Sequence, residues 1–89
     1  MQQKQVTIIN RLGLHARAAA KFVTLASSFS SEIDLSRDNQ TVNGKSIMGV
    51  MMLAASRGTL LTLTTKGVDE NEAITRIEEL VLSKFGEEE

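Results

Sequence analysis

Apolar and polar residues alternate along three segments of the chain, as they do in strands with one buried face. The segments span residues 6–9, 32–36 and 59–65. Their apolar positions, expected on one inner face, are Val6, Ile8, Ile33, Leu35, Leu61 and Leu63. A turn at 37–39 and a short return strand at 40–42 follow the second segment. The pattern therefore predicts four short strands.

Two other segments carry apolar residues at the three- and four-residue spacing of one buried helix face. The first stripe is Ala19, Phe22, Val23 and Ala26, and the second is Ile74, Ile77 and Val81. We expect the first helix to begin at His15 and the serines from Ser27 to end it. Asp69 and Glu72 resemble a capping box at the start of the other helix. Gly86 is expected to stop that helix, with a frayed acidic tail over 87–89.

A third, shorter helix is predicted after the turn dipeptide Asn43-Gly44, from Ile47 to about Ala54. Ser46 lies where an N-cap residue is expected. Val50, Leu53 and Ala54 are suited to its core face. The order β-α-β-β-α-β-α favours a single α+β domain over residues 1–89, with helices covering one face of an antiparallel sheet.

Composition excludes several function classes. The net charge is -1, so the chain lacks the broad basic surface that nucleic-acid backbones require. It has no cysteine and one histidine, which excludes disulfides and the usual metal clusters, and no cofactor is expected. No apolar run is long enough to span a bilayer and the N-terminus lacks an apolar signal core, so we expect a cytoplasmic protein.

The histidine has unusual neighbours. Gly13 allows a close backbone approach just before the helix. His15 lies where the first N–H groups of a helix point outward, and those groups favour an anion. Arg17 follows two residues later with a planar fork that suits phosphate oxygens. A lone histidine is most often a surface residue or a cap, but this combination favours an anion site or a phosphoryl acceptor.

Two segments resemble the signatures of a known family. Residues 13–19 have the sequence GLHARAA and are followed by Phe22 and Val23. Residues 43–51 have the sequence NGKSIMGVM. Both closely resemble motifs of the histidine phosphocarrier (HPr) family of the bacterial phosphotransferase system, and the similarity runs over nearly the whole chain.

The resemblance implies an open-faced sandwich, in which a four-stranded antiparallel sheet carries three helices on one face. It implies a carrier rather than an enzyme, with a phosphoryl group taken up at Nδ1 of His15 from Enzyme I and given to an Enzyme IIA protein. It also implies that Arg17 steadies the phosphoryl group, which we expect to contact the backbone N–H groups of Ala16 and Ala18. The family commonly has Pro at position 18, and with Ala18 the chain resembles carriers of the nitrogen-related branch (NPr), which often lack this Pro.

The short third helix suggests a second functional region. In some relatives the serine at the position of Ser46 is phosphorylated, which implies regulation by a serine kinase/phosphorylase in addition to the capping role. The helix is apolar on nearly every side, so part of it must stay exposed. Flexible methionines suit a surface that docks different partners. The docking patch is expected to comprise Ile47, Met48, Met51 and Met52.

Two other functions remain open at this point. The same surface suits a non-covalent regulatory module that binds a small anion or a transcription factor. A free-standing enzyme is the least favoured class, because a single histidine has no paired acid to complete a hydrolytic cycle. We expect a monomer, since a carrier must keep its face free. The pathway, sugar uptake or nitrogen and carbon regulation, is not encoded visibly.

Overall fold

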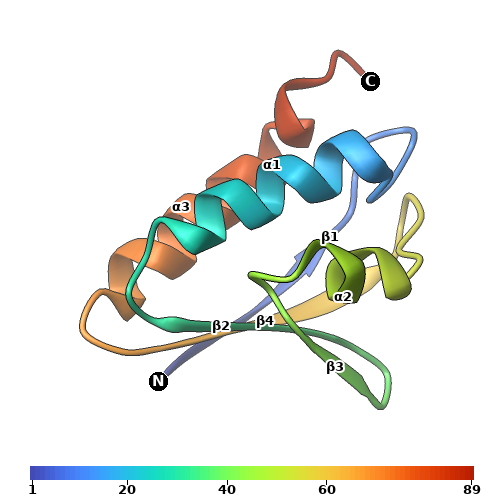
Figure 1. Ribbon diagram of the computed structural model, residues 1–89. Coiled ribbons are helices and arrows are strands. Elements are labelled where there is room, and N and C mark those ends of the chain that lie inside the picture. The colour runs from blue at the N-terminus through green and yellow to red at the C-terminus, as the bar shows by residue number, and fades with distance from the viewer.

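Four strands form one antiparallel sheet in the computed structural model, which describes residues 1–89 (Figure 1). The strands are β1 (Gln2–Thr7), β2 (Glu32–Arg37), β3 (Gln40–Asn43) and β4 (Leu60–Lys66). Their spatial order is β1-β4-β2-β3, so the last strand of the chain lies between β1 and β2. Leu63 at the centre of β4 pairs with Lys4 on one side and with Leu35 on the other.

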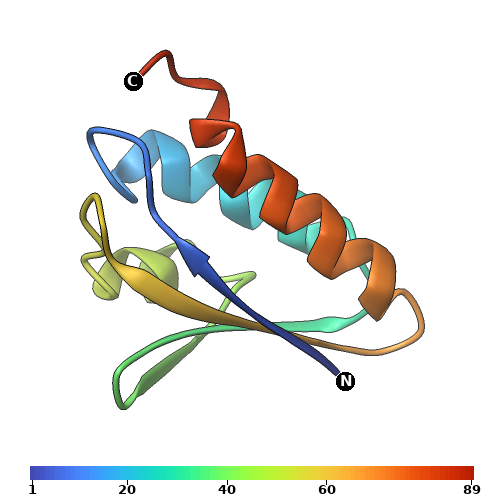
Figure 2. The same cartoon turned by 180° about the vertical axis from the view of Figure 1, so that it is seen from behind.

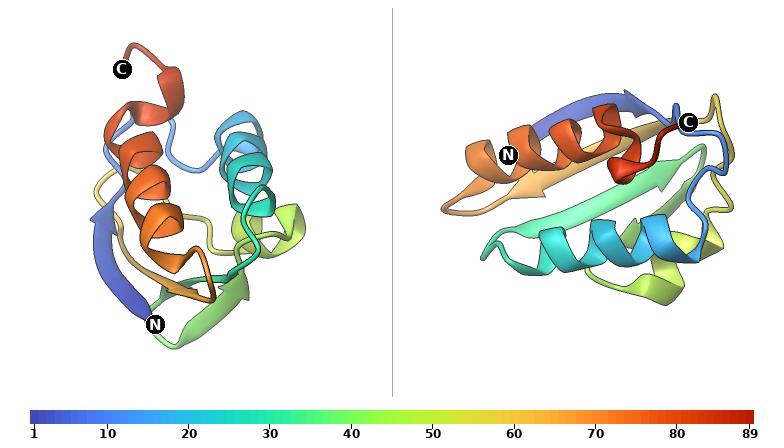
Figure 3. Two further views of the ribbon diagram at one scale, coloured as in Figure 1. Left: turned by 90° about the vertical axis from the view of Figure 1, so that its left-hand side faces the viewer. Right: turned by 90° about the horizontal axis from the view of Figure 1, so that it is seen from above.

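Three helices cover one face of this sheet. They are α1 (Ala16–Ser27), α2 (Ile47–Met52) and α3 (Glu70–Leu82), and a short 3₁₀ turn, η1 (Lys84–Gly86), follows α3. Helices α1 and α3 lie side by side, and α2 lies beside α1 near β3 (Figure 3). Seen from behind, β1 and α3 are in front, and the opposite face of the sheet carries no helix (Figure 2). The α+β class and the helices on one face are confirmed.

Burial follows the alternation of the sequence. The six apolar positions predicted to face inward in the strands are all at least 95% buried. They pack against one stripe of each long helix, which confirms most of the predicted helix faces; only Val23 remains half-buried. The helix residues of this core are Ala18, Ala19, Phe22, Ala26, Val50, Ala73, Ile74, Ile77 and Val81.

Helix α2 ends earlier than predicted. It stops at Met52, and Ala54 is exposed with φ of 49°, so the prediction that Ala54 belongs to the core face is wrong. Val50 and Leu53 are buried as expected. Arg37 provides the physical reason, because its Nη1 donates to the backbone oxygens of Leu53 and Ala54 at 2.9 and 3.1 Å. This guanidinium satisfies carbonyl groups that another helical turn would have used.

The predicted capping box of α3 is wrong. Asp69 is the N-cap residue, but its carboxylate makes no capping bond. It accepts instead from the backbone N–H groups of Ser30 and Ser31, both at 2.9 Å, and from the Ser31 hydroxyl. The Ser31 hydroxyl, and then the Ser30 N–H, lower the pKa of Asp69. The carboxylate therefore ties the start of α3 to the segment that follows α1.

The acidic tail does not fray. Helix α3 ends at Leu82, before Gly86, and the chain turns back toward the start of α1 (Figure 3). Phe85 has φ of 56° and a completely buried side chain, so a core contact directs the turn. The prediction of a frayed tail rested on the charge and position of residues 87–89 and did not consider burial of Phe85.

Removal of the Asp69 charge should weaken the fold in a pH-dependent way. A carboxyl whose pKa is lowered by folding stabilises the native state above its unfolded pKa, and this contribution disappears as pH falls through the folded pKa. Asp69→Asn should therefore lower the free energy of unfolding at pH 7, and the difference from the parent protein should shrink below about pH 3.9. Urea unfolding at several pH values measures it.

Asp34→Asn is the control, since Asp34 is exposed and its side chain makes no hydrogen bond or ion pair. A deficit for Asp69→Asn that persists unchanged at low pH would contradict a charge-dependent link.

Candidate functional site

Helix α1 begins at an imidazole. His15 is the N-cap residue, with extended backbone angles of φ -71° and ψ 176°, and its side chain makes no capping bond. Its backbone oxygen accepts the first helical hydrogen bond, from the Ala19 N–H at 2.8 Å. The ring is partly accessible, with 29% of the side chain exposed.

The loop before His15 is fixed against the segment that follows α2. Gly13 has φ of 68°, and a Cβ atom at this position would lie only 2.5 Å from the backbone oxygen of Ala55. Leu14 donates its N–H to that same oxygen at 2.8 Å and buries its side chain. The close approach expected at Gly13 is present, and it sets where the imidazole leaves the chain.

Three backbone N–H groups at the start of α1 have no acceptor. They belong to Ala16, Arg17 and Ala18, the first three residues of the helix. The α1 side chains that hold this end are apolar and buried, among them Ala18 and Ala19. The partial positive charge of a helix N-terminus is concentrated on such groups, which makes the position favourable for an anion.

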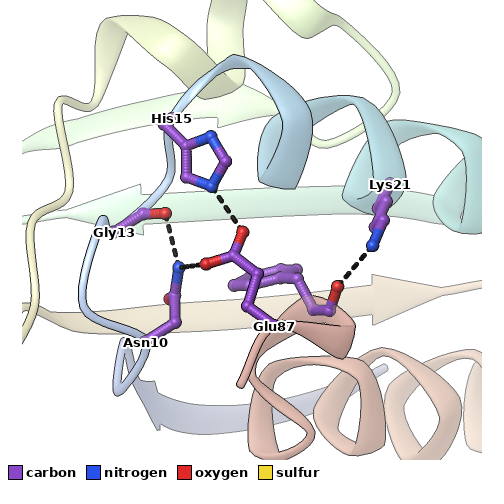
Figure 4. Close-up of polar contacts among 6 residues, drawn as sticks. Asn10, Gly13, His15, Lys21 and Glu87 are labelled. Carbon is purple, nitrogen blue, oxygen red and sulfur yellow. Dashed lines mark hydrogen bonds and ion pairs between the residues drawn. The ribbon is translucent and has the colours of Figure 1, made fainter. Parts of the chain in front are cut away.

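A carboxylate from the far end of the chain contacts the imidazole (Figure 4). Glu87 Oε2 lies 2.5 Å from Nε2 of His15, and its Oε1 accepts from Nδ2 of Asn10 at 3.0 Å. The same Asn10 nitrogen donates to the backbone oxygen of Gly13 at 2.8 Å. The Asn10 hydrogen bond, followed by the one from His15, lowers the pKa of Glu87. Glu87 is therefore held as a carboxylate beside the ring.

Two further contacts hold the segment that carries Glu87. Lys21 Nζ, from α1, donates to the backbone oxygen of Phe85 at 2.7 Å (Figure 4). Arg11 contacts Glu89 twice, through its backbone N–H at 2.8 Å and through Nε at 2.7 Å. The contact through Nε is solvent-exposed and contributes little. The buried Phe85 ring and the Lys21 bond are the stronger restraints.

Arg17 lies beside the histidine without a partner of its own. It is exposed and makes no ion pair or side-chain hydrogen bond. Arg17, His15, Ala16 and Glu87 all line one open depression. Of the predicted residues of the first motif, Ala18 does not line it, and its side chain is buried.

Ser46 and the methionines form a second region. The predicted cap is confirmed, because Ser46 Oγ accepts from the Gly49 N–H at 3.1 Å. Four exposed apolar side chains of α2, 40–73% accessible, make up what we call the α2 patch: Ile47, Met48, Met51 and Met52. Helix α2 packs on α1, so the patch lies on the same side of the sheet as the helix that begins at His15 (Figure 1).

Asn10 and Glu87 are the site residues that sequence reasoning missed. Asn10 had no predicted role in the site, and Glu87 was expected to belong to a frayed tail. Glu87 lies 72 residues from His15 along the chain, and no local pattern signals the contact. The one signal in the sequence was charge, because the three glutamates at 87–89 can pair with basic side chains such as Arg11.

The arrangement is suited to an anion that bonds to, or rests beside, an imidazole. No group of three His, Cys, Asp or Glu side chains is placed to hold a metal ion. None of the helices has the length and apolar character needed to cross a membrane.

Comparisons with known proteins agree with this geometry. Residues 2–83 match the family described as "PTS HPr component phosphorylation site". The phosphocarrier protein HPr of Cupriavidus necator is 53% identical over the full length of both chains, and that of Treponema pallidum is 51% identical over 99% of this chain and all of the relative. The crystal structure of an HPr from Thermoanaerobacter tengcongensis covers both chains completely with a TM-score of 0.97 and 50% identity. The chain belongs to the HPr family of phosphocarrier proteins of the phosphotransferase system, which carry phosphohistidine as a transfer intermediate and are not themselves enzymes.

Proposed function

We propose that the chain accepts a phosphoryl group on Nδ1 of His15 from Enzyme I, which draws it from phosphoenolpyruvate, and donates it to an Enzyme IIA protein. The observation that carries the proposal is the start of α1, where an accessible imidazole stands beside three N–H groups without acceptors. Nδ1 makes no hydrogen bond, whereas Nε2 is occupied by Glu87.

The negative charge of a phosphoryl group is complementary to the positive groups at the start of α1. A phosphoryl group carries nearly two negative charges and three acceptor oxygens near pH 7. The N–H groups of Ala16, Arg17 and Ala18 and the helix dipole favour those oxygens, and the Arg17 side chain adds a forked cationic donor. The phosphorylated state is thereby stabilised without a metal ion.

The transfer itself conserves charge and electrons. The Nδ1 lone pair forms the bond to phosphorus while the bond between phosphorus and the donor breaks, and that electron pair stays with the donor. Delivery to the acceptor is the same exchange in reverse. Partner proteins supply the catalytic groups, which is consistent with a site that has one imidazole and no paired acid on its Nδ1 side.

The wider assignment is also part of the proposal. Phosphoenolpyruvate is a cytoplasmic metabolite, so the carrier works in the cytoplasm, and a monomer leaves the His15 face free for one partner at a time. The Enzyme IIA protein that accepts the phosphoryl group determines whether the pathway is sugar uptake or nitrogen and carbon regulation. Because Ala18 stands where the family commonly has proline, Enzyme IIA proteins of both the sugar-transport and the nitrogen-related branch should be tested as acceptors.

His15→Ala should abolish phosphorylation and leave the fold intact, because His15 is partly exposed and its side chain does not cap α1. Incubation with phosphoenolpyruvate and Enzyme I, followed by mass spectrometry, should show one acid-labile, base-stable phosphoryl group on the parent protein and none on the variant. Circular dichroism checks the fold. Labelling of His15→Ala would move the acceptor elsewhere, and no labelling of either protein would favour the non-covalent regulatory module.

The α2 patch is proposed as the docking surface for Enzyme I and Enzyme IIA. Its support is the grouping of four exposed apolar residues on one short helix, where flexible thioethers can adapt to different partners. Ser46 lies at the start of the same helix and is half-buried. Phosphorylation there would add charge beside the patch, so we propose that a serine kinase/phosphorylase uses Ser46 as a negative switch.

A negative charge on α2 should therefore weaken docking. Met48→Asp and Ser46→Asp should each raise the apparent KM for transfer from Enzyme I about tenfold, the effect of losing one interface hot spot. Val68→Asp is the control: Val68 is 93% exposed, in the loop between β4 and α3 at the other end of the sheet (Figure 1). Steady-state transfer measures all three variants. A KM equal to the parent value for both α2 variants, or an equal rise for Val68→Asp, would contradict docking through the patch.

A further inference from the structure

We infer that Glu87 is a positioning residue, which holds His15 in the tautomer that carries hydrogen on Nε2 and so leaves the lone pair of Nδ1 available for phosphorus. The inference deepens the proposed function and rests on it, because it assigns the orientation of the accepting imidazole. It concerns a residue outside both sequence motifs and outside the family match over residues 2–83.

Hydrogen-bond chemistry determines the direction of the contact. An ionised carboxylate can only accept, so in the 2.5 Å contact with Glu87 Oε2 the hydrogen belongs to Nε2. In a neutral imidazole one nitrogen carries hydrogen and the other carries the lone pair. Nδ1 is then the nucleophilic nitrogen, and it points away from Glu87 (Figure 4).

The carboxylate is rigidly supported. Asn10 is completely buried, and its Nδ2 gives one hydrogen bond to Glu87 Oε1 and the other to the Gly13 backbone oxygen. Only the nitrogen end of this amide can donate to a carboxylate, which leaves Asn10 Oδ1 buried without a partner. Asn10 thus joins the loop that presents His15 to the group that orients its ring. An orienting residue needs such support if it is to fix a geometry.

The same contact also stabilises the phosphorylated ring. When Nδ1 bonds to phosphorus and Nε2 keeps its hydrogen, the imidazole becomes positively charged. Glu87 lies directly beside that new charge, and its own exposed fraction is only 18%. A charge-assisted hydrogen bond in this position favours the product of the transfer without moving any other group.

The opposite role for Glu87 is obstruction, in which the acidic tail blocks the site until it is displaced. The geometry favours positioning, because the carboxylate occupies Nε2 and leaves Nδ1 free. The two roles predict opposite changes in rate, so one set of variants separates them.

The test combines the state of the ring with the rate of transfer. In ¹⁵N spectra of the unphosphorylated protein at alkaline pH, the parent protein should show a single tautomer with hydrogen on Nε2. Glu87→Ala should shift both ring nitrogens toward the values of a tautomer mixture and slow transfer from Enzyme I about tenfold, the contribution of one charge-assisted hydrogen bond. Glu87→Gln keeps an acceptor oxygen, so it should retain the tautomer and slow transfer less.

Glu88→Ala is the matched control. It removes the same charge from the neighbouring position, where the side chain lines the same depression but makes no hydrogen bond or ion pair, so the ring nitrogens should keep the parent values. Ring nitrogens in Glu87→Ala identical to those of the parent protein would overturn the inference, and so would faster transfer, which would establish obstruction. The tautomer is measured without Enzyme I, so the failure of phosphorylation at His15 would be recognised separately.

Discussion

Helix α1 starts with three backbone N–H groups that nothing in the protein accepts, and its N-cap residue is a histidine. Most helices satisfy such groups with the side chain of Ser, Thr, Asp or Asn, which also blocks the position. Here burial of Ala18, Ala19 and Phe22 stabilises the helix instead, so its end stays open. Gly13 serves the same arrangement, because its close approach to the Ala55 backbone sets the position of the imidazole.

Helices α1 and α2 begin in different ways. Helix α2 begins with Ser46, whose hydroxyl accepts from the Gly49 N–H, whereas the side chain of His15 caps no N–H group of α1. Its exposed side chains are apolar, whereas those at the start of α1 include Arg17 and His15. Helix α2 packs on α1, so the charged depression at His15 and the apolar α2 patch lie on the same side of the sheet.

Local patterns in the sequence predicted most of the fold. The alternation at Leu61 and Leu63 marks one face of a strand for burial, and the helical stripe around Phe22 does the same for a helix. The structure buries both faces. The errors arose where a distant group intervened. Asp69 accepts from Ser31, 38 residues away along the chain, and Arg37 donates to the backbone oxygens of Leu53 and Ala54 at the end of α2. The candidate site shows the same division. Its first motif is contiguous and visible, whereas Glu87, the partner of the ring, and Asn10, which donates to Glu87, come together only through the tertiary fold.

Spectra of the phosphorylated protein test most directly whether the start of α1 holds the phosphoryl group. After phosphorylation by Enzyme I and phosphoenolpyruvate, phosphorus should couple to Nδ1 of His15. The amide protons of Ala16, Arg17 and Ala18 should move downfield, while those at the start of α3 should stay in place, because only the α1 groups gain an acceptor. Phosphorus bonded to Nε2, or α1 amide signals that move no more than those of α3, would contradict a phosphoryl site built on the open end of this helix.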